Sequence, residues 1–164
     1  MADAVSGWAL SQNSFTLRKI KIETQRCCGP DDLIKAINAT RITLRRALDR
    51  RQRENERWRG VRCVGCFTPS FDGNMWSATF NGVLELGRVH EVSFLDAMEP
   101  LTQVRLQTFP AALIENDIHR HVHFAFATTN GLKMCDPHFL ALYFNTINRN
   151  GGFKPLMFRR GFQS

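Results

Sequence analysis

The chain has 164 residues, of which 43% are hydrophobic and 23% are charged, and its formal net charge is +7. So large an apolar fraction excludes a chain that is mainly disordered, and no run approaches the ~18 consecutive apolar residues of a membrane-spanning helix. We therefore expect one globular domain with a substantial core.

Residues 1–12 are expected to be a flexible N-terminal arm, and residues 13–164 a single domain. The arm has no hydrophobic core of the signal-peptide type. Five cysteines is an odd number, which together with that arm favours a reducing compartment with free thiols. The domain begins with a predicted strand over residues 14–23, where β-branched and aromatic residues partly alternate with polar ones, and the motif CCGP at residues 27–30 ends it.

The longest predicted element is a helix over residues 31–59. Pro30 suits a first helical turn, and Asp31 and Asp32 suit the positive end of the helix dipole. At about 100° per residue one face collects the apolar side chains of Leu33, Ile34, Ile37, Leu44 and Leu48. The opposite face collects Arg46, Arg50, Arg53 and Arg57, which we call the arginine ridge. The helix should therefore bury an apolar seam and expose the ridge, and Gly60 should end it.

The second half of the chain is predicted to be mainly β. Strands are expected at residues 59–67, 76–86, 91–95 and 119–127. The motif FDGN at residues 71–74 predicts a hairpin between the first two, whereas two prolines favour an irregular connection over residues 99–117. The motif DP at 136–137 predicts the start of a short helix over residues 139–145, and residues 153–162 suit an edge strand. The order predicts an α+β fold: an antiparallel sheet with one long amphipathic helix and a short C-terminal helix.

Positive charge is concentrated in two segments. Residues 41–59 hold eight arginines and three acids, and residues 145–164 hold four basic residues and no acid. Such zones on a nearly neutral body indicate a polyanionic partner, either nucleic acid or an anionic lipid surface. The arginine ridge would set guanidinium forks, which match phosphate geometry, along about 16 Å of helix. The alternative is a solvated face whose arginines pair with neighbouring acids, namely Asp49, Glu54 and Glu56.

A second basic patch is predicted in the C-terminal segment, at Lys154, Arg159 and Arg160. Its basic residues are interleaved with Phe153, Met157, Phe158 and Phe162. That mixture suits a lipid headgroup boundary, a nucleic-acid surface or a partner groove. The alternative is an ordinary edge strand that buries its phenylalanines.

Three histidines form the strongest catalytic candidate. His119, His121 and His123 alternate, so on a strand they would share one face. The pair His121 and His123 around a valine is similar to the metal-binding pair of HUH-type nucleases, with Tyr143 as the nucleophile on DNA. Tyr143 lacks the lysine that follows the nucleophile in that family, so the favoured interpretation is a structural histidine face, partly exposed or packed on a partner.

The remaining motifs give little support to metal binding or catalysis. Cys63 and Cys66 form a single CxxC, and inside a strand an offset of three places the two sulfurs on opposite faces. Buried thiols that act as small apolar groups are therefore favoured over a zinc site. No nucleophile elbow, P-loop or dinucleotide fingerprint is present. We expect neither an enzyme nor a cofactor.

The order of these elements resembles one family. The matching stretches are FTLRKIKI at residues 15–22, the helix from Asp31, the strands at residues 61–67 and 76–86, the strand at residues 121–127 leading into DPHF at residues 136–139, and KPLMF at residues 154–158. Together they resemble the matrix proteins of rhabdoviruses and related negative-strand RNA viruses, including the compact plant-infecting members. The sequence departs from many members by lacking a Pro-rich late-domain motif, and by having no basic residue in residues 1–17.

The resemblance implies a non-enzymatic structural protein that lies beneath the envelope of the virion. Such a protein self-associates into oligomers or lattices and bridges the viral nucleocapsid and its RNA to the anionic inner membrane surface, as a peripheral membrane protein. A viral glycoprotein tail is a further implied partner, and the host cytoplasm and nucleus are further implied locations. The alternative from a different class is a viral RNA-binding protein, a silencing suppressor or regulator, that uses the same arginine ridge.

Overall fold

The computed structural model describes residues 2–12, 16–54, 56, 61–86, 91–98, 104–109, 114–127, 132 and 135–160. Its centre is a five-stranded antiparallel sheet in the order β4-β1-β3-β2-β5. The strands are β1 Leu17–Glu23, β2 Arg62–Phe71, β3 Trp76–Glu85, β4 Val104–Thr108 and β5 Met157–Arg160. The helices are α1 Ala2–Ser11, α2 Pro30–Glu54, α3 Glu91–Ala97, α4 Ile114–Phe126 and α5 Pro137–Arg149. The predicted α+β fold with an antiparallel sheet is confirmed.

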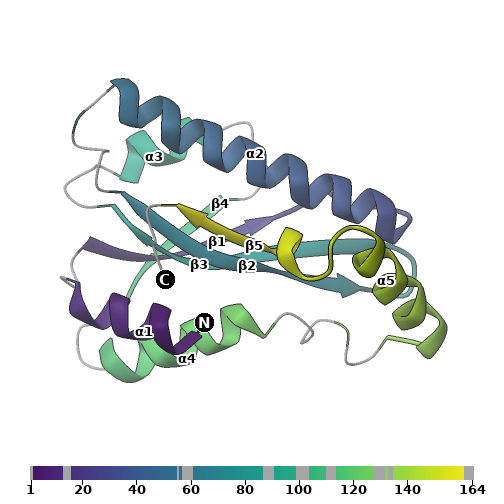
Figure 1. Cartoon of the computed structure of the whole chain (residues 1–164). Coiled ribbons are helices and arrows are strands. Elements are labelled where there is room, and N and C mark those ends of the chain that lie inside the picture. The colour runs from purple at the N-terminus through teal and green to yellow at the C-terminus, as the bar shows by residue number, and fades with distance from the viewer. Residues whose placement is uncertain are drawn as a thin grey trace.

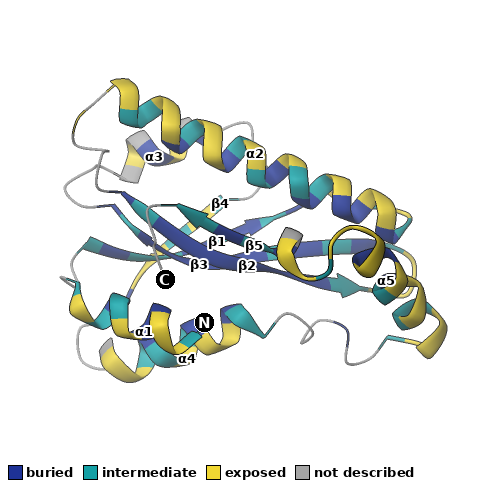
Figure 2. Cartoon of the chain, in the orientation of Figure 1, coloured by how far each residue is buried: buried dark blue, intermediate teal, exposed yellow. Residues whose placement is uncertain are grey.

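Helices cover both faces of the sheet (Figure 1). Helix α2 lies across one face, and α1 and α4 lie together on the other. Side chains alternate along each strand, so Ile20 and Phe80 belong to the core on the α2 side, whereas Val64 and Val83 belong to the core on the α1 and α4 side. The central strands β2 and β3 are therefore largely buried on both faces, whereas β4 at one edge is partly exposed (Figure 2).

Helix α2 forms where the sequence predicts a helix, but it ends at Glu54, before the predicted end at residue 59. It begins at Pro30, and Asp32 accepts from the Lys35 ammonium over 2.8 Å in the first turn. All five side chains of the predicted apolar seam, Leu33, Ile34, Ile37, Leu44 and Leu48, are buried in the core. Burying such a stripe against a sheet supplies most of the stability of an amphipathic helix.

The predicted hairpin joins β2 to β3. The strands pair from Arg62 with Glu85 to Phe71 with Trp76, and Gly73 in the turn has φ of +99°, which glycine adopts without strain. The short C-terminal helix is α5, with the Asp136 side chain accepting from the backbone N–H of His138. A 3-10 turn, η5 Lys154–Leu156, then leads into β5, which is an edge strand as predicted.

The strand predicted over residues 119–127 is wrong, because this segment lies in helix α4. The buried side chains of Ile118, Val122 and Ala125 recur at the spacing of one helix face. The alternating histidines are typical of a strand, but the buried face of the helix determines the structure, and its Ile118 and Val122 pack in a core with residues of the sheet.

Three further expectations differ from the structure. Residues 91–95, predicted as a strand, lie in helix α3, where Phe94 is buried, and Met98 just after the helix is buried one turn further on. Residues 2–11, expected in a flexible arm, form helix α1, which packs on α4 through the buried Val5 and Ala9. Strand β4 lies within the segment for which an irregular connection was predicted, and it pairs with β1.

Candidate polyanion-binding surface

The arginine ridge lies on the side of α2 that faces away from the sheet. Arg46, Arg50 and Arg53 are all exposed, while Leu44 and Leu48 beside them are fully buried. The three span about 10 Å along the axis at 1.5 Å per residue. Arg57 lies outside the described residues. The described part of the ridge thus stands on a helix whose other side is fixed in the core (Figure 2).

The acids near the ridge neutralise only part of it. Arg50 donates from Nε to Glu54 over 2.7 Å, and Arg51 shares the same carboxylate at 3.4 Å. Hydrogen bonding from Arg50 lowers the pKa of Glu54. Among the described residues, no carboxylate forms an ion pair with Arg46 or Arg53. Because an exposed i,i+4 ion pair contributes little to stability, Arg50 can exchange Glu54 for a phosphate.

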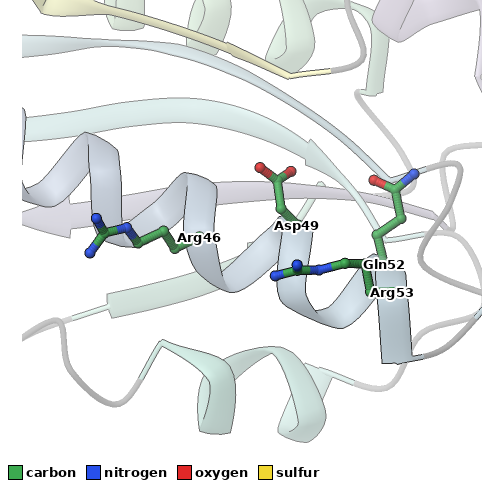
Figure 3. A pocket seen from close by; sticks show the side chains of 4 residues that line it. All are labelled: Arg46, Asp49, Gln52 and Arg53. Atoms are coloured by element: carbon green, nitrogen blue, oxygen red, sulfur yellow. The ribbon is translucent and has the colours of Figure 1, made fainter.

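An open hollow of about 750 Å³ adjoins the ridge, and its described lining is Arg46, Asp49, Gln52 and Arg53. Figure 3 shows the two arginines extending in the same direction along the helix, whereas Asp49 and Gln52 point to a different side of it. The acid therefore does not cap either guanidinium, and both remain available to an anion.

Arg160 contacts Asp49 and Gln52 and does not form a surface patch. Its side chain is 10% exposed. It donates to Asp49 Oδ1 over 2.9 Å and to the backbone oxygen of Val61 over 2.6 Å, and it also contacts Gln52. This corrects the expectation that Arg160 contacts nucleic acid or lipid, because its guanidinium forms internal hydrogen bonds that join β5 to α2.

The second basic patch is also dispersed. Neighbouring residues of a strand point to opposite faces, so Arg159 and Arg160 cannot act together. Arg159 pairs with Val64 across the ladder and is half-buried, and Lys154 is exposed in the 3-10 turn. Lys154 alone among the three is exposed, so the arginine ridge remains the stronger candidate.

The histidines do not converge. His121 is directed at the sheet, where its Nε2 lies 2.9 Å from the backbone oxygen of Gly82, and burial lowers its pKa. His119 and His123 stack at 6.4 Å between ring centroids, and His123 lies 3.3 Å from Asp3. The shared strand face on which the nuclease alternative depends is absent from this part of the structure.

Tyr143 and the CxxC cysteines are core residues. Tyr143 is fully buried and stacks on Trp76 at 5.7 Å, and burial raises the pKa of its phenol. Cys63 and Cys66 sit on opposite faces of β2, as the spacing predicts, and burial raises the pKa of both thiols to about 12. A thiolate is the form that binds zinc, so neither position favours a metal. Among the described residues, no three His, Cys, Asp or Glu side chains form a metal-binding group.

A second basic hollow, not predicted from the sequence, lies on the α4 face of the sheet. It has a volume of about 340 Å³ and is lined in part by Lys19, Lys21 and Arg105. The strand register explains the cluster, since Lys21 on β1 lies directly opposite Arg105 on β4. Lys19 pairs with Asp117, and Lys21 pairs with Glu23 at 2.9 Å, so two of these three cations are already neutralised.

No protein-family model, curated protein or solved structure matches this chain at a significant level of similarity. In the described parts of the chain, the helices are all too short or too polar to cross a membrane.

Proposed function

We propose that this chain is a non-enzymatic structural protein of the viral matrix type. It self-associates and bridges a ribonucleoprotein to the inner surface of the viral membrane, and its arginine ridge supplies the contact with phosphate groups. The observation that carries the proposal is the exposure of Arg46, Arg50 and Arg53 on one helix face, with two of them free of ion pairs among the described residues.

The ridge suits polyanions whatever their sequence. Guanidinium forks bind phosphate oxygens in a bidentate manner, and such contacts release counterions and carry no base specificity. The backbone of α2 is already fixed on the sheet, so binding a polyanion orders only the arginine side chains and not the helix that carries them. A nucleocapsid and an anionic leaflet both present repeated phosphates, so one surface serves either partner.

The test reverses the charge of the three described arginines of the ridge and keeps the fold. Arg46→Glu, Arg50→Glu and Arg53→Glu in one chain should abolish co-sedimentation with a 40-nucleotide oligouridylate and with phosphatidylserine-containing vesicles at low salt. Circular dichroism should be unchanged, since none of the three side chains is buried. For wild type, the three arginines should contribute about −2 to the slope of log K against log salt for the single-stranded RNA.

A charge-matched control separates the ridge from net charge. Lys35→Glu, Arg120→Glu and Arg26→Glu change exposed residues scattered over the molecule by the same total charge. This control should bind nearly as wild type does. Equal loss of binding in both variants would contradict the assignment of the ridge.

Negative-stain microscopy of wild type at moderate salt tests the assembly. Ordered sheets or filaments support a matrix protein. Tight binding of naked RNA by dispersed particles would overturn the matrix proposal and favour an RNA-binding suppressor or regulator.

A further inference from the structure

A small pocket lies on the flank of α2 that faces β5, away from the arginine ridge. Its volume is about 220 Å³, and its described lining is Asn38, Arg41, Ile42, Arg45 and Phe158. Pockets for drug-sized ligands begin at about 300 Å³, so this one suits a group of a few heavy atoms. Two cations, one amide and two apolar walls form a site for a compact anion.

Arg41 is held there without a counterion. Its side chain is partly buried, and its NH1 donates to the Asn38 side chain over 3.1 Å. The Nε of Arg41 is buried and has no hydrogen-bond partner among the described residues. A buried guanidinium N–H that loses water without gaining an acceptor is destabilising, and a buried charge is normally paired.

Arg45 adds a second unpaired cation one turn further along α2. It is exposed, and no described carboxylate forms an ion pair with it or with Arg41. Asp49, one more turn along, is held by Arg160. Burial lowers the pKa of Arg41, and the charge of Arg45 lowers it further. Like charges at i,i+4 repel, and an anion between them would remove this repulsion.

We propose that this pocket binds a phosphate group, with Arg41 and Arg45 as its two charged ligands and Asn38 as the residue that positions Arg41. The inference rests on the proposed function, because the phosphate belongs to the RNA backbone or to a lipid headgroup on the same polyanionic surface. The guanidiniums of Arg41 and Arg45 supply the charged donors, and Ile42 and the buried Phe158 supply the apolar part of the lining.

The first test uses inorganic phosphate and the full chain. The melting temperature of wild type should rise by about 4 °C at ten times the dissociation constant, relative to chloride at equal ionic strength. Arg41→Met should lose this rise in melting temperature, and Arg45→Gln should weaken the binding of phosphate about tenfold. In phosphate-free buffer Arg41→Met should be at least as stable as wild type, because it removes an unpaired buried charge. An equal phosphate-induced rise in wild type and Arg41→Met would overturn the proposal.

The controls separate this site from the ridge. The triple ridge variant (Arg46, Arg50 and Arg53 to Glu) should keep the phosphate-induced rise, because none of its residues lines this pocket. If that variant also kept RNA and vesicle binding, the proposed function would fail while the pocket stood.

The source of the phosphate is resolved with two probes. Weaker binding of an octauridylate by Arg41→Met assigns the pocket to the RNA backbone, and weaker binding of phosphatidylserine vesicles assigns it to lipid. Unchanged binding of both probes would overturn the proposal.

Discussion

Arg160 on β5 donates from Nε to Asp49 Oδ1 on α2 over 2.9 Å, and thereby ties the edge strand of the sheet to the helix above it. The same guanidinium reaches the backbone oxygen of Val61, just before β2. One side chain thus joins three segments that are far apart in the sequence.

Arg160→Ala should therefore destabilise the fold rather than weaken polyanion binding. Losing charge-assisted hydrogen bonds from a largely buried guanidinium should lower the free energy of unfolding by about 1–3 kcal/mol. Urea unfolding measures this change. Arg46→Ala is the matched control, and as an exposed substitution it should stay within about 0.5 kcal/mol of wild type. A stable Arg160→Ala protein that fails to bind RNA would contradict the structural role.

Gly65 and Gly82 face each other across β2 and β3 beneath the ring of Phe80. A Cβ on Gly65 would overlap the backbone oxygen of Asn81 and lie 2.6 Å from Cα of Gly82. Backbone atoms in a central ladder cannot move aside, so Gly65→Ala should destabilise by about 3 kcal/mol, at the upper end of overpacking.

Gly7→Ala is the control for that substitution. Gly7 is exposed inside α1, and a Cβ there meets nothing within 4 Å. The alanine should raise the melting temperature, since glycine inside a helix costs about 0.5–1 kcal/mol relative to alanine. Destabilisation of similar size by both substitutions would show that close packing at Gly65 is not the cause.

The sequence predicts α2, the β2–β3 hairpin and α5 because each carries a local signal. A long apolar stripe, an FDGN turn and an Asp-Pro start act within a few residues. Helix α4 was missed because the alternation of His119, His121 and His123 is more conspicuous than the helical spacing of Ile118, Val122 and Ala125. Polar residues on the solvent side do not determine the period of an element; the buried residues do.

The candidate site divides in the same way. Exposure of Arg46, Arg50 and Arg53 follows from helical geometry, so it could be predicted residue by residue. The burial and the partners of Arg160 and Arg41 could not be predicted, because both depend on how β5 lies against the flank of α2. A sequence shows that a basic residue is present, but only tertiary packing decides whether it is paired, buried or free.

Tyr143 carries a hydroxyl that the fold does not use. Its Oη is buried without a hydrogen-bond partner among the described residues, while its ring stacks on Trp76. Tyr143→Phe should therefore raise the free energy of unfolding by about 1 kcal/mol, because an unsatisfied buried polar group is removed. Tyr143→Ala should lower it by about 3–5 kcal/mol through loss of the ring. Destabilisation by the phenylalanine would indicate a partner for the hydroxyl.

The thiols of Cys63 and Cys66 make stability fall at alkaline pH. Burial raises the pKa of both from 9.0 to about 12 in the folded chain. Between these two values the unfolded chain has lost protons that the folded chain keeps, so unfolding becomes easier as pH rises. Each thiol should lower the free energy of unfolding by up to about 1.4 kcal/mol per pH unit in this range. Urea unfolding from about pH 8 to about pH 10 measures it.

Variants isolate this contribution from that of the lysines and the other groups that titrate in the same range. Cys63→Ala with Cys66→Ala should flatten the dependence of unfolding free energy on pH, even if the double variant is less stable at every pH. Cys28→Ala removes an exposed thiol and should leave the slope unchanged. The two buried thiols act independently through desolvation, so each single variant should remove about half of the difference. A double variant with the slope of wild type would show that these thiols are hydrated and ionise freely.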